Sequence, residues 1–500
     1  MPKLYSSLKT HWFFICVLSI FIGFYLVNIS GWLIHDDEGT DLYEAWQLSE
    51  GKQPGIDFIA EQQPLFLTIG QSLLPLSDDS ATAVQYVRLA SALQVLAGAI
   101  FLAFVVKQLW DIPTAVLTFG LMLTSGLIYE QARLYRPDPM MFAWELFGFG
   151  FVLLAVKLGK RPYWAAAGIA YGIAVLMKLF GIFPVLGLVF YYLYMFIKQR
   201  DQWQRHLYNG LAFAIPFLVV SLGTSTLLYG QFGFYYQEIL NQHLSLGQQK
   251  SILDQVNIGI TKYASFILVN FVYILIIPLA ILNRFSKEEP IDHPVNALLY
   301  SQLLAPIIFF FISRPVFPRY FIFLLPTLAL SLAYNIKGLF NKIEQNEARK
   351  GTIVSLIIVA VLIFSAYITV PSIKNRFRRQ ETDTLALAQL IQSHTAKDEI
   401  ALSDYASLNF HANRESIYEA SIIAGGRIGG GVITGALLIE RMESSAAKLV
   451  LVHVKGGSPS PHQLTHLIDL DLFEAYLEEK YQLIETFDRA GQIIEIYKRQ

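Results

Sequence analysis

Acidic side chains stand directly beside apolar segments at two places in the sequence. Asp36, Asp37 and Glu38 follow the first apolar run, and Asp138 ends the stretch Arg133-Leu134-Tyr135-Arg136-Pro137-Asp138 before a later run. Ionisable groups at a membrane edge are costly to place and usually have a function. A carboxylate kept ionised by neighbouring arginines could remove a proton from an acceptor hydroxyl, as a general base does. The alternative is a layer of structural salt bridges between loops.

Basic side chains gather at the same face. In the topology derived below they lie at external ends of apolar segments, where topology gives no reason for positive charge: Arg88, Arg133, Arg136, Lys178, Arg314 and Arg319. Several cationic donors from separate segments could hold a phosphate together, and the arginine fork matches phosphate oxygens. For any single one, the alternative is a side chain that extends to the lipid headgroups.

Other chemistry-bearing residues predict no second kind of site. His35 has no histidine partner at helical spacing, so no metal site is predicted. Cys16 is the only cysteine, which excludes an internal disulfide framework and a multi-thiolate metal site. The glycine-rich run 425–431 lacks the Lys-Ser/Thr ending of a phosphate loop and is interpreted as a flexible surface loop.

The composition is typical of a membrane protein. Hydrophobic residues make up 54% of the 500 residues and charged residues only 15%, which is more apolar surface than one soluble core needs. The 38 basic and 39 acidic residues give a net charge of -1, so no basic excess indicates nucleic acid as a partner.

Recurrent apolar segments predict a polytopic α-helical membrane protein with about 11 transmembrane helices. They lie at about 12–34, 86–106, 112–129, 139–156, 163–177, 180–197, 209–229, 263–283, 296–312, 320–336 and 351–370. With the short basic N-terminus in the cytoplasm, the connections predicted to be cytoplasmic carry lysine and arginine, as the positive-inside rule requires. The acids after the first span then lie on the external face, and so does everything after Pro371. A plasma (inner) membrane fits this orientation.

Two domains are predicted. Residues 1–370 form the transmembrane domain, with external loops at about 35–85 and 230–262, the second long enough to close over a site as a lid. Residues 371–500 form a small external (periplasmic) α/β domain. Its elements are predicted as helices at 384–394 and 463–480 and as strands at 399–402, 448–454 and 493–497.

Four motifs carry a resemblance to a known family. They are Asp37-Glu38-Gly39 with Tyr43, Gly51, Pro54, Asp57 and Pro64 after it; Tyr135-Arg136-Pro137-Asp138; Leu176-Met177-Lys178-Leu179-Phe180-Gly181; and Arg319-Tyr320 before Leu325-Pro326. With these motifs the chain resembles the C-type multispanning glycosyltransferases (GT-C) that use polyprenyl-phosphate sugars. The similarity is to the branch with the protein O-mannosyltransferases and the lipid A aminoarabinose transferase.

The resemblance implies an inverting transfer of a hexosyl or pentosyl group from a polyprenyl-phosphate donor to an acceptor at the external face, with no other cofactor. It implies Asp37 as the general base, with Asp36 able to exchange roles with it, and Glu38 as the residue that positions acceptor or sugar. Asp138 would organise neighbouring arginines or contact the acceptor. The donor phosphate would lie among Arg88, Arg133, Arg136, Lys178 and Arg319. A glycan, a lipid or a protein hydroxyl could be the acceptor.

Two other classes remain open. A transporter would have a similar number of spans, but its charged residues and helix breaks should lie near the bilayer midplane, whereas most ionisable groups here cluster at one interface. In a cell-envelope assembly scaffold, the external acids would be structural.

Overall fold

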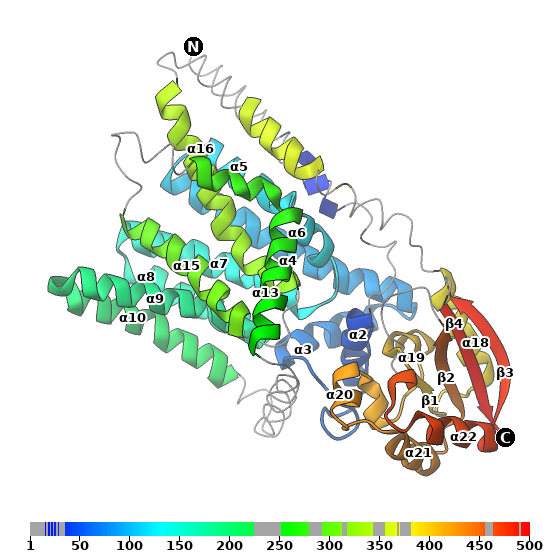
Figure 1. Ribbon diagram of the computed structural model, residues 1–500. Helices are drawn as coiled ribbons and strands as arrows, with labels where there is room; N and C mark the ends of the chain where they lie inside the picture. The colour runs from blue at the N-terminus through cyan, green and yellow to red at the C-terminus, as the bar shows by residue number, and fades with distance from the viewer. Residues whose placement is uncertain are drawn as a thin grey trace. The chain divides into compact units, whose positions relative to one another are not determined.

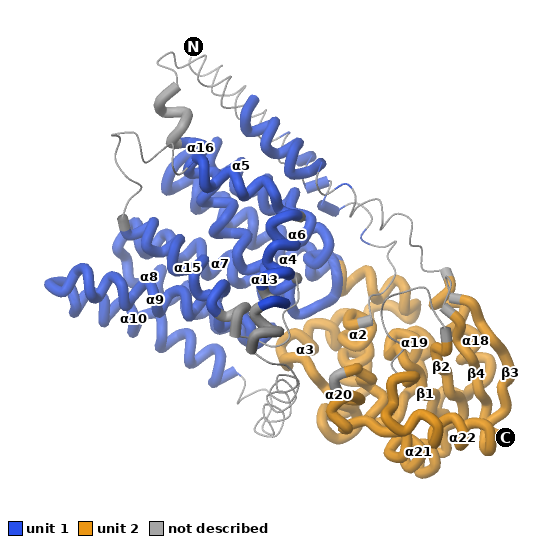
Figure 2. The backbone as a smooth tube through the Cα atoms, in the orientation of Figure 1, with its two compact units in different colours: residues 1–29, 89–230, 250–376 blue, residues 30–88, 231–249, 377–500 orange. Residues whose placement is uncertain are grey.

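A computed structural model describes residues 16, 19–20, 22–23, 25–26, 29, 36–224, 252–279, 293–312, 318–343, 356–367, 370, 382–455, 464–489 and 492–500. His35, Arg314 and most of the predicted lid at 230–262 lie outside these residues. The chain divides into two compact units (Figure 2). Unit 1 comprises residues 1–29, 89–230 and 250–376, and unit 2 comprises residues 30–88, 231–249 and 377–500.

Unit 1 is helical. Its described helices include α4 (Ser80–Leu109, from residue 89), α5 (Ile112–Leu123), α6 (Gly126–Gln131), α7 (Pro137–Leu158), α8 (Arg161–Met177), α9 (Ile182–Lys198), α10 (Trp203–Leu218), α13 (Ile252–Val269), α15 (His293–Ile312), α16 (Leu325–Ile343) and the short helix Leu356–Tyr367. Short 3-10 segments flank some of them: η2 (Leu179–Gly181), η3 (Arg200–Gln202), η5 (Phe271–Leu275) and η6 (Pro318–Leu324). A π-helical segment, η4 (Val219–Gly223), continues α10. Helix α8 packs against α7 and α10, and α9 packs against α15 (Figure 1).

The described part of unit 1 contains membrane-spanning helices. Helical segments long and apolar enough to cross a membrane are Ser80–Leu109, Pro137–Leu158, Leu179–Lys198, Arg200–Gly223 and Arg319–Lys337, which makes 5. The segments Ile260–Leu268 and Phe271–Leu279, bent by 91° at their junction, raise the number to 6 if they form one broken span. The protein is therefore a multi-pass membrane protein, and the number of about 11 spans stays a prediction. Shorter apolar helices, such as α5 with 12 residues, account for part of the difference.

Unit 2 combines the segment after the predicted first span with the C-terminal part of the chain. Its helices are α2 (Asp36–Ser49), α3 (Pro64–Leu73), α18 (Thr382–His394), α19 (Ala406–Ala412), α20 (Gly425–Gly429), α21 (Gly435–Ser444) and α22 (Leu470–Lys480), together with the first turns of α4 and the short turns η1 (Leu74–Leu76), η7 (Tyr418–Ile422) and η8 (Leu464–His466). Its strands are β1 (Ala401–Ser403), β2 (Leu449–Lys455), β3 (Tyr481–Arg489) and β4 (Gln492–Arg499).

The strands form one mixed sheet in the order β1-β2-β4-β3. Strands β1 and β2 are parallel, and β4 pairs antiparallel with both β2 and β3. Alternate residues of β2 enter two different apolar clusters, Val450 and Val452 in one and Leu449 and Leu451 in the other, so both faces of the sheet are covered. The predicted strands correspond to β1, β2 and β4, whereas β3 was not predicted.

The prediction of a flexible loop over 425–431 is wrong for residues 425–429, which form α20. The carbonyl oxygen of Ala424 accepts hydrogen bonds from the backbone N–H groups of Arg427 at 2.9 Å and Ile428 at 3.1 Å. The Ile428 side chain is buried in the core of unit 2. Burial of this apolar side chain stabilises a helical turn that the glycine content alone disfavours.

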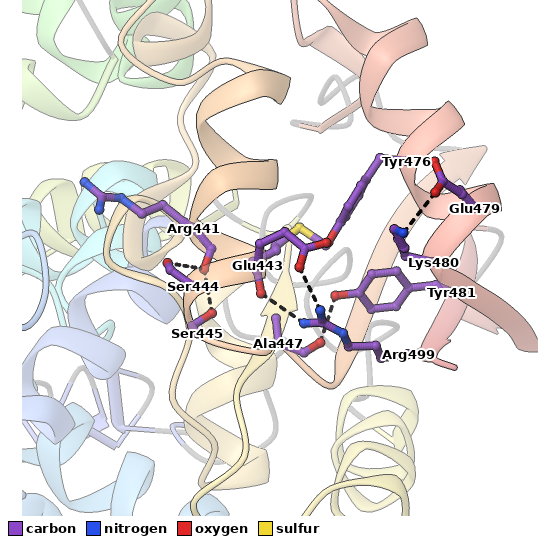
Figure 3. Close-up of polar contacts among 11 residues, drawn as sticks. Arg441, Glu443, Ser444, Ser445, Ala447, Tyr476, Glu479, Lys480, Tyr481 and Arg499 are labelled. Atoms are coloured by element: carbon purple, nitrogen blue, oxygen red, sulfur yellow. Dashed lines mark hydrogen bonds and ion pairs between the residues drawn. The ribbon is translucent and has the colours of Figure 1, made fainter.

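Polar contacts hold the C-terminal strand to two helices (Figure 3). The Glu443 carboxylate on α21 accepts a hydrogen bond from the Tyr476 hydroxyl on α22 at 2.6 Å and one from the Arg499 guanidinium on β4 at 2.8 Å. The Tyr481 hydroxyl donates to the carbonyl oxygen of Ala447 at 2.8 Å. Glu443 thus links α21 both to α22 and to the end of β4.

Candidate functional site

Helix α2 carries the acidic motif in its first turn. Glu38 is fully buried, and its two oxygens accept hydrogen bonds from the Nε and Nη2 atoms of Arg88 at 2.8 and 2.7 Å. Arg88 comes from the third turn of α4 and is buried as well. The fork-to-carboxylate geometry fixes α2 against the start of α4 within unit 2. Glu38 and Arg88, predicted for different roles, are thus partners of each other.

Asp37 is only half-buried, and it begins a row of acids on one face of α2. Asp41 and Glu44 follow at spacings of four and three residues, which places the three side chains on the same side of the helix. Both are buried. Asp41 and Glu44 were missed as site residues, although their helical spacing from Asp37 was visible in the sequence. For Asp36, the structure describes the helical backbone only.

Glu44 is an acid held by backbone groups. Its carboxylate accepts hydrogen bonds from the N–H of Glu61 at 3.1 Å and of Gln62 at 3.4 Å. Burial raises the pKa of Glu44 well above its usual value, and the nearby charges of Asp41 and Glu61 raise it further. The protonated form is therefore favoured in the folded protein more than in the unfolded chain.

Asp138 is the centre of a second ionic cluster, which lies in unit 1. It stands in the first turn of α7 behind Pro137, a residue suited to a helix start, and its carboxylate is buried. Lys178 donates from Nζ to Oδ1 at 2.8 Å, and the Nε atom of Arg319 lies 4.0 Å from Oδ2. Arg136, the residue at the N-terminal cap of α7, adds a third positive charge nearby.

Two short backbone breaks bring the cations to Asp138. Lys178 is a single extended residue between α8 and η2, with φ -158° and ψ 136°. Three residues later, Gly181 approaches the last turns of α8 so closely that a Cβ atom there would lie 2.7 Å from the carbonyl carbon of Ala174. Arg319 lies in η6 immediately before α16. Lys178 and Arg319, 141 residues apart in sequence, thereby meet one carboxylate.

Aromatic rings line the cations of this cluster. The Lys178 Nζ atom lies 5.3 Å from the ring centroids of both Phe180 and Tyr320, and the Arg319 Cζ atom lies 5.6 Å from the Tyr320 centroid. The two rings pack edge to face at 4.6 Å. Ring faces attract cations and restrict their side chains. Lysine and arginine side chains are donors that suit an anion.

Arg133 contacts backbone carbonyl groups and an aromatic ring. Its Nε atom donates to the carbonyl oxygen of Tyr129 at 3.1 Å, its Nη1 atom donates to that of Tyr25 at 3.4 Å, and its Cζ atom lies 3.7 Å from the centroid of the Tyr129 ring. Lys178 and Arg319 both approach Asp138, whereas an organising role of Asp138 toward Arg133 stays a prediction. Among the described residues, no group of three or more His, Cys, Asp or Glu side chains could hold a metal ion.

Comparisons with known proteins agree with this fold. Residues 66–223 match a family model described as dolichyl-phosphate-mannose-protein mannosyltransferase. No curated protein matches the chain. The matched region contains Arg88, Asp138 and Lys178, but ends before Arg319.

Solved structures match over nearly the whole chain. The crystal structure of ArnT from Cupriavidus metallidurans bound to undecaprenyl phosphate has 15% sequence identity, covers 97% of this chain and 98% of that chain, and gives a TM-score of 0.62. The apo state of the same protein covers 98% of both chains with a TM-score of 0.65. The oligosaccharyltransferase AglB from Archaeoglobus fulgidus, in complex with an inhibitory peptide and a dolichol-phosphate, has 12% identity, covers 98% of this chain and 74% of that chain, and gives a TM-score of 0.60.

Identities of 12–15% indicate a shared fold rather than a shared substrate. The family model covers two of the four motifs, Tyr135-Arg136-Pro137-Asp138 and Leu176-Met177-Lys178-Leu179-Phe180-Gly181. The resemblance of this chain to the C-type multispanning glycosyltransferases is therefore confirmed, by the family model over residues 66–223 and by the fold over nearly its full length.

Proposed function

We propose that the protein is an inverting membrane glycosyltransferase that moves a hexosyl or pentosyl group from a polyprenyl-phosphate donor to an acceptor at the external face. The observation that carries the proposal is the buried Asp138 with Lys178 and Arg319 around it, in a chain that shares its fold with a protein crystallised with undecaprenyl phosphate. A polyprenyl phosphate is an anion at a membrane edge, and this cluster offers several cationic donors to it.

The phosphate of the donor would be held by Lys178, Arg319 and Arg136. Negative charge develops on the phosphate oxygen as the sugar leaves, and fixed positive charges stabilise it most in that state. Asp138 keeps the cations in place without cancelling their charge. Contacts of Arg88 and Arg133 with the donor stay predictions, because these arginines are engaged by Glu38 and by Tyr129 in the structure.

Asp37 would act as the general base. Its half-buried side chain is accessible to an acceptor, in contrast to the fully buried Glu38 beside it. The base takes the proton of the acceptor hydroxyl, the acceptor oxygen forms a bond to the anomeric carbon, and the bond from that carbon to the phosphate oxygen breaks. Polyprenyl phosphate leaves with the bonding electrons, and the anomeric configuration inverts. Glu38 would act by positioning.

The topology is part of the proposal. We assign residues 1–370 to the transmembrane domain, with about 11 spans and external loops at about 35–85 and 230–262, and residues 371–500 to the external domain. The segment 230–262 would cover the site. The membrane would be a plasma (inner) membrane, with the site and the C-terminal domain on its external side.

Replacing Asp37 by Asn tests the proposal. The purified variant in detergent should transfer radiolabel from polyprenyl-phosphate hexose or pentose to membrane glycoconjugates about 10²–10⁴-fold more slowly than the wild type, with an unchanged unfolding temperature. Glu50→Gln, at an exposed acid just after α2, is the matched control and should transfer normally. Unchanged transfer by Asp37→Asn would exclude Asp37 as the base. Wild-type protein in lipid vesicles that moves the label across the bilayer without forming a glycoside would favour a transporter.

A further inference from the structure

Helix α2 is held from a second side by the C-terminal part of unit 2. Helices α2 and α19 pack against each other although more than 350 residues separate them in sequence (Figure 1). Gly39 stands at the contact, one residue after the buried Glu38 and two residues after Asp37. Any displacement of this contact is therefore passed directly to the acidic motif.

The two backbones approach as closely as the side chains at the contact permit. A Cβ atom at position 39 would lie 2.6 Å from the Cβ atom of Ser407 and 3.1 Å from its backbone nitrogen. Carbon atoms at 2.6 Å overlap strongly, so any other residue at position 39 would push α2 and α19 apart. Gly39 and Ser407 are both buried, which leaves no space to accommodate the shift locally.

Neighbouring hydrogen bonds fix the register of α2 on the same side. One turn after Gly39, the hydroxyl oxygen of Tyr43 accepts a hydrogen bond from the backbone N–H of Ser416 at 2.9 Å. At the start of α4, the Ser80 hydroxyl lies 2.7 Å from Nδ1 of His411, which is on α19. Helix α19 is thus tied both to α2 and to the helix whose Arg88 holds Glu38.

We propose that Gly39 and Ser407 are positioning residues, and that their contact sets the place of the Asp37 carboxylate for catalysis. This inference rests on the proposed function, and it gives the C-terminal segment a direct part in the reaction. The physical basis is geometric: a general base must reach the acceptor proton within hydrogen-bond distance, and a displacement of about 1 Å can lower the rate about 10²-fold.

Gly39→Ala with a compensating Ser407→Gly tests the inference. Gly39→Ala should lower kcat for transfer from radiolabelled polyprenyl-phosphate sugar about 10–100-fold. The KM for the donor should change less than about twofold, because the cations proposed to hold the phosphate are untouched. Ser407→Gly removes the atom at 2.6 Å, so the double variant should recover most of the lost rate.

The control is Gly210→Ala, at a helical glycine where an added Cβ meets no atom within 4 Å, and it should leave kcat unchanged. The unfolding temperature should fall in Gly39→Ala and recover in the double variant, as kcat does. Full activity of Gly39→Ala would overturn the positioning role. So would a double variant that regains the unfolding temperature but not kcat. Either result would leave the proposed function standing. Absence of transfer by the wild type would overturn the proposed function, and the catalytic role of this contact with it.

Discussion

The Glu38–Arg88 ion pair on α2 and the Asp138 cluster on α7 both join a carboxylate to basic side chains, but the basic side chains differ in solvent exposure. The side chains of Glu38 and Arg88 expose 0% and 2% of their surface, and the guanidinium contacts both carboxylate oxygens. Asp138 is equally buried at 1%, but Lys178 and Arg319 retain 15% and 18%. A closed pair holds two elements together, whereas partly exposed cations keep donors for a ligand. On the proposed function, the pair in unit 2 contributes stability and the cluster in unit 1 binds the donor phosphate.

Breaking the closed pair should have the largest effect on stability. Arg88→Met leaves the Glu38 carboxylate buried without its guanidinium, which costs about 3–5 kcal/mol in proteins generally. The unfolding temperature in detergent should fall by several degrees. Adding Glu38→Met should restore much of it, since two apolar side chains can replace a buried pair.

Another result for Arg88→Met would assign Arg88 to donor binding instead of stability. If the variant unfolds at the wild-type temperature but needs far more donor for half-maximal transfer, Arg88 contacts the phosphate, as the sequence predicted.

Removing a basic side chain of the Asp138 cluster should weaken binding of the donor and leave the stability of the protein nearly unchanged. Arg319→Gln leaves the 2.8 Å contact of Lys178 with Asp138 intact, so the unfolding temperature should change little. A hydrogen bond to a charged group contributes about 1.5–3 kcal/mol, so the KM for the polyprenyl-phosphate donor should rise roughly 10–100-fold.

Arg441→Gln is the matched control for this loss of charge. Arg441 pairs with Glu419 at 2.9 Å and is about half exposed. Its replacement should leave the KM for the donor unchanged, and a normal donor KM in Arg319→Gln would remove that arginine from the phosphate site.

Glu44 differs from Glu38 and Asp138, because its buried carboxylate accepts hydrogen bonds from backbone N–H groups, whereas theirs accept hydrogen bonds from basic side chains. Its pKa is raised by folding, so the folded state is favoured most at a pH below the unfolded value and loses stability as the pH rises through the folded value. Glu44→Gln is neutral at every pH. Its unfolding temperature should therefore fall less than that of the wild type between pH 5 and pH 8, by about 2–4 °C for each kcal/mol of penalty removed. Parallel pH profiles for both proteins would contradict a raised pKa.

The smallest effect is expected at the exposed Glu443. This carboxylate contacts Tyr476 and Arg499 at the surface, where solvent screens ion pairs. Glu443→Gln should change the unfolding temperature by no more than about 2 °C. A larger loss would mean that exposure is a poor guide to the contribution of an ionic contact in this protein.

Local patterns in the sequence predicted the kinds of element well. Long apolar runs predicted the multi-pass helical architecture, and short strand-like segments in the C-terminal part predicted β1, β2 and β4. Strand β3 was missed because its residues 482–488 are mostly polar and exposed, as befits the edge of the sheet. The number of spans depends on helix lengths that apolar composition alone does not define.

The sequence did not predict which candidate side chains contact each other. Arg88 and Lys178 each lie near the end of an apolar segment and were assigned the same role, because their difference in burial arises only from packing. Lys178 is 40 residues from Asp138, and Glu38 is 50 residues from Arg88. Likewise, the Tyr43 contact with Ser416 spans 373 residues and joins α2 to the C-terminal segment. Side chains so distant in sequence leave no periodic signal of their contact.

The tight turn after Lys178 has a consequence for how the sequence can vary. Gly181 touches the end of α8, so the chain between Met177 and Ile182 has no slack. One inserted residue in a helix rotates everything after it by roughly 100°. An insertion here would therefore move the Lys178 amine away from Asp138 or change the orientation of α9. Insertions and deletions among homologous chains should therefore avoid this turn and accumulate in the connections after α7 and α9, where exposed residues link the helices.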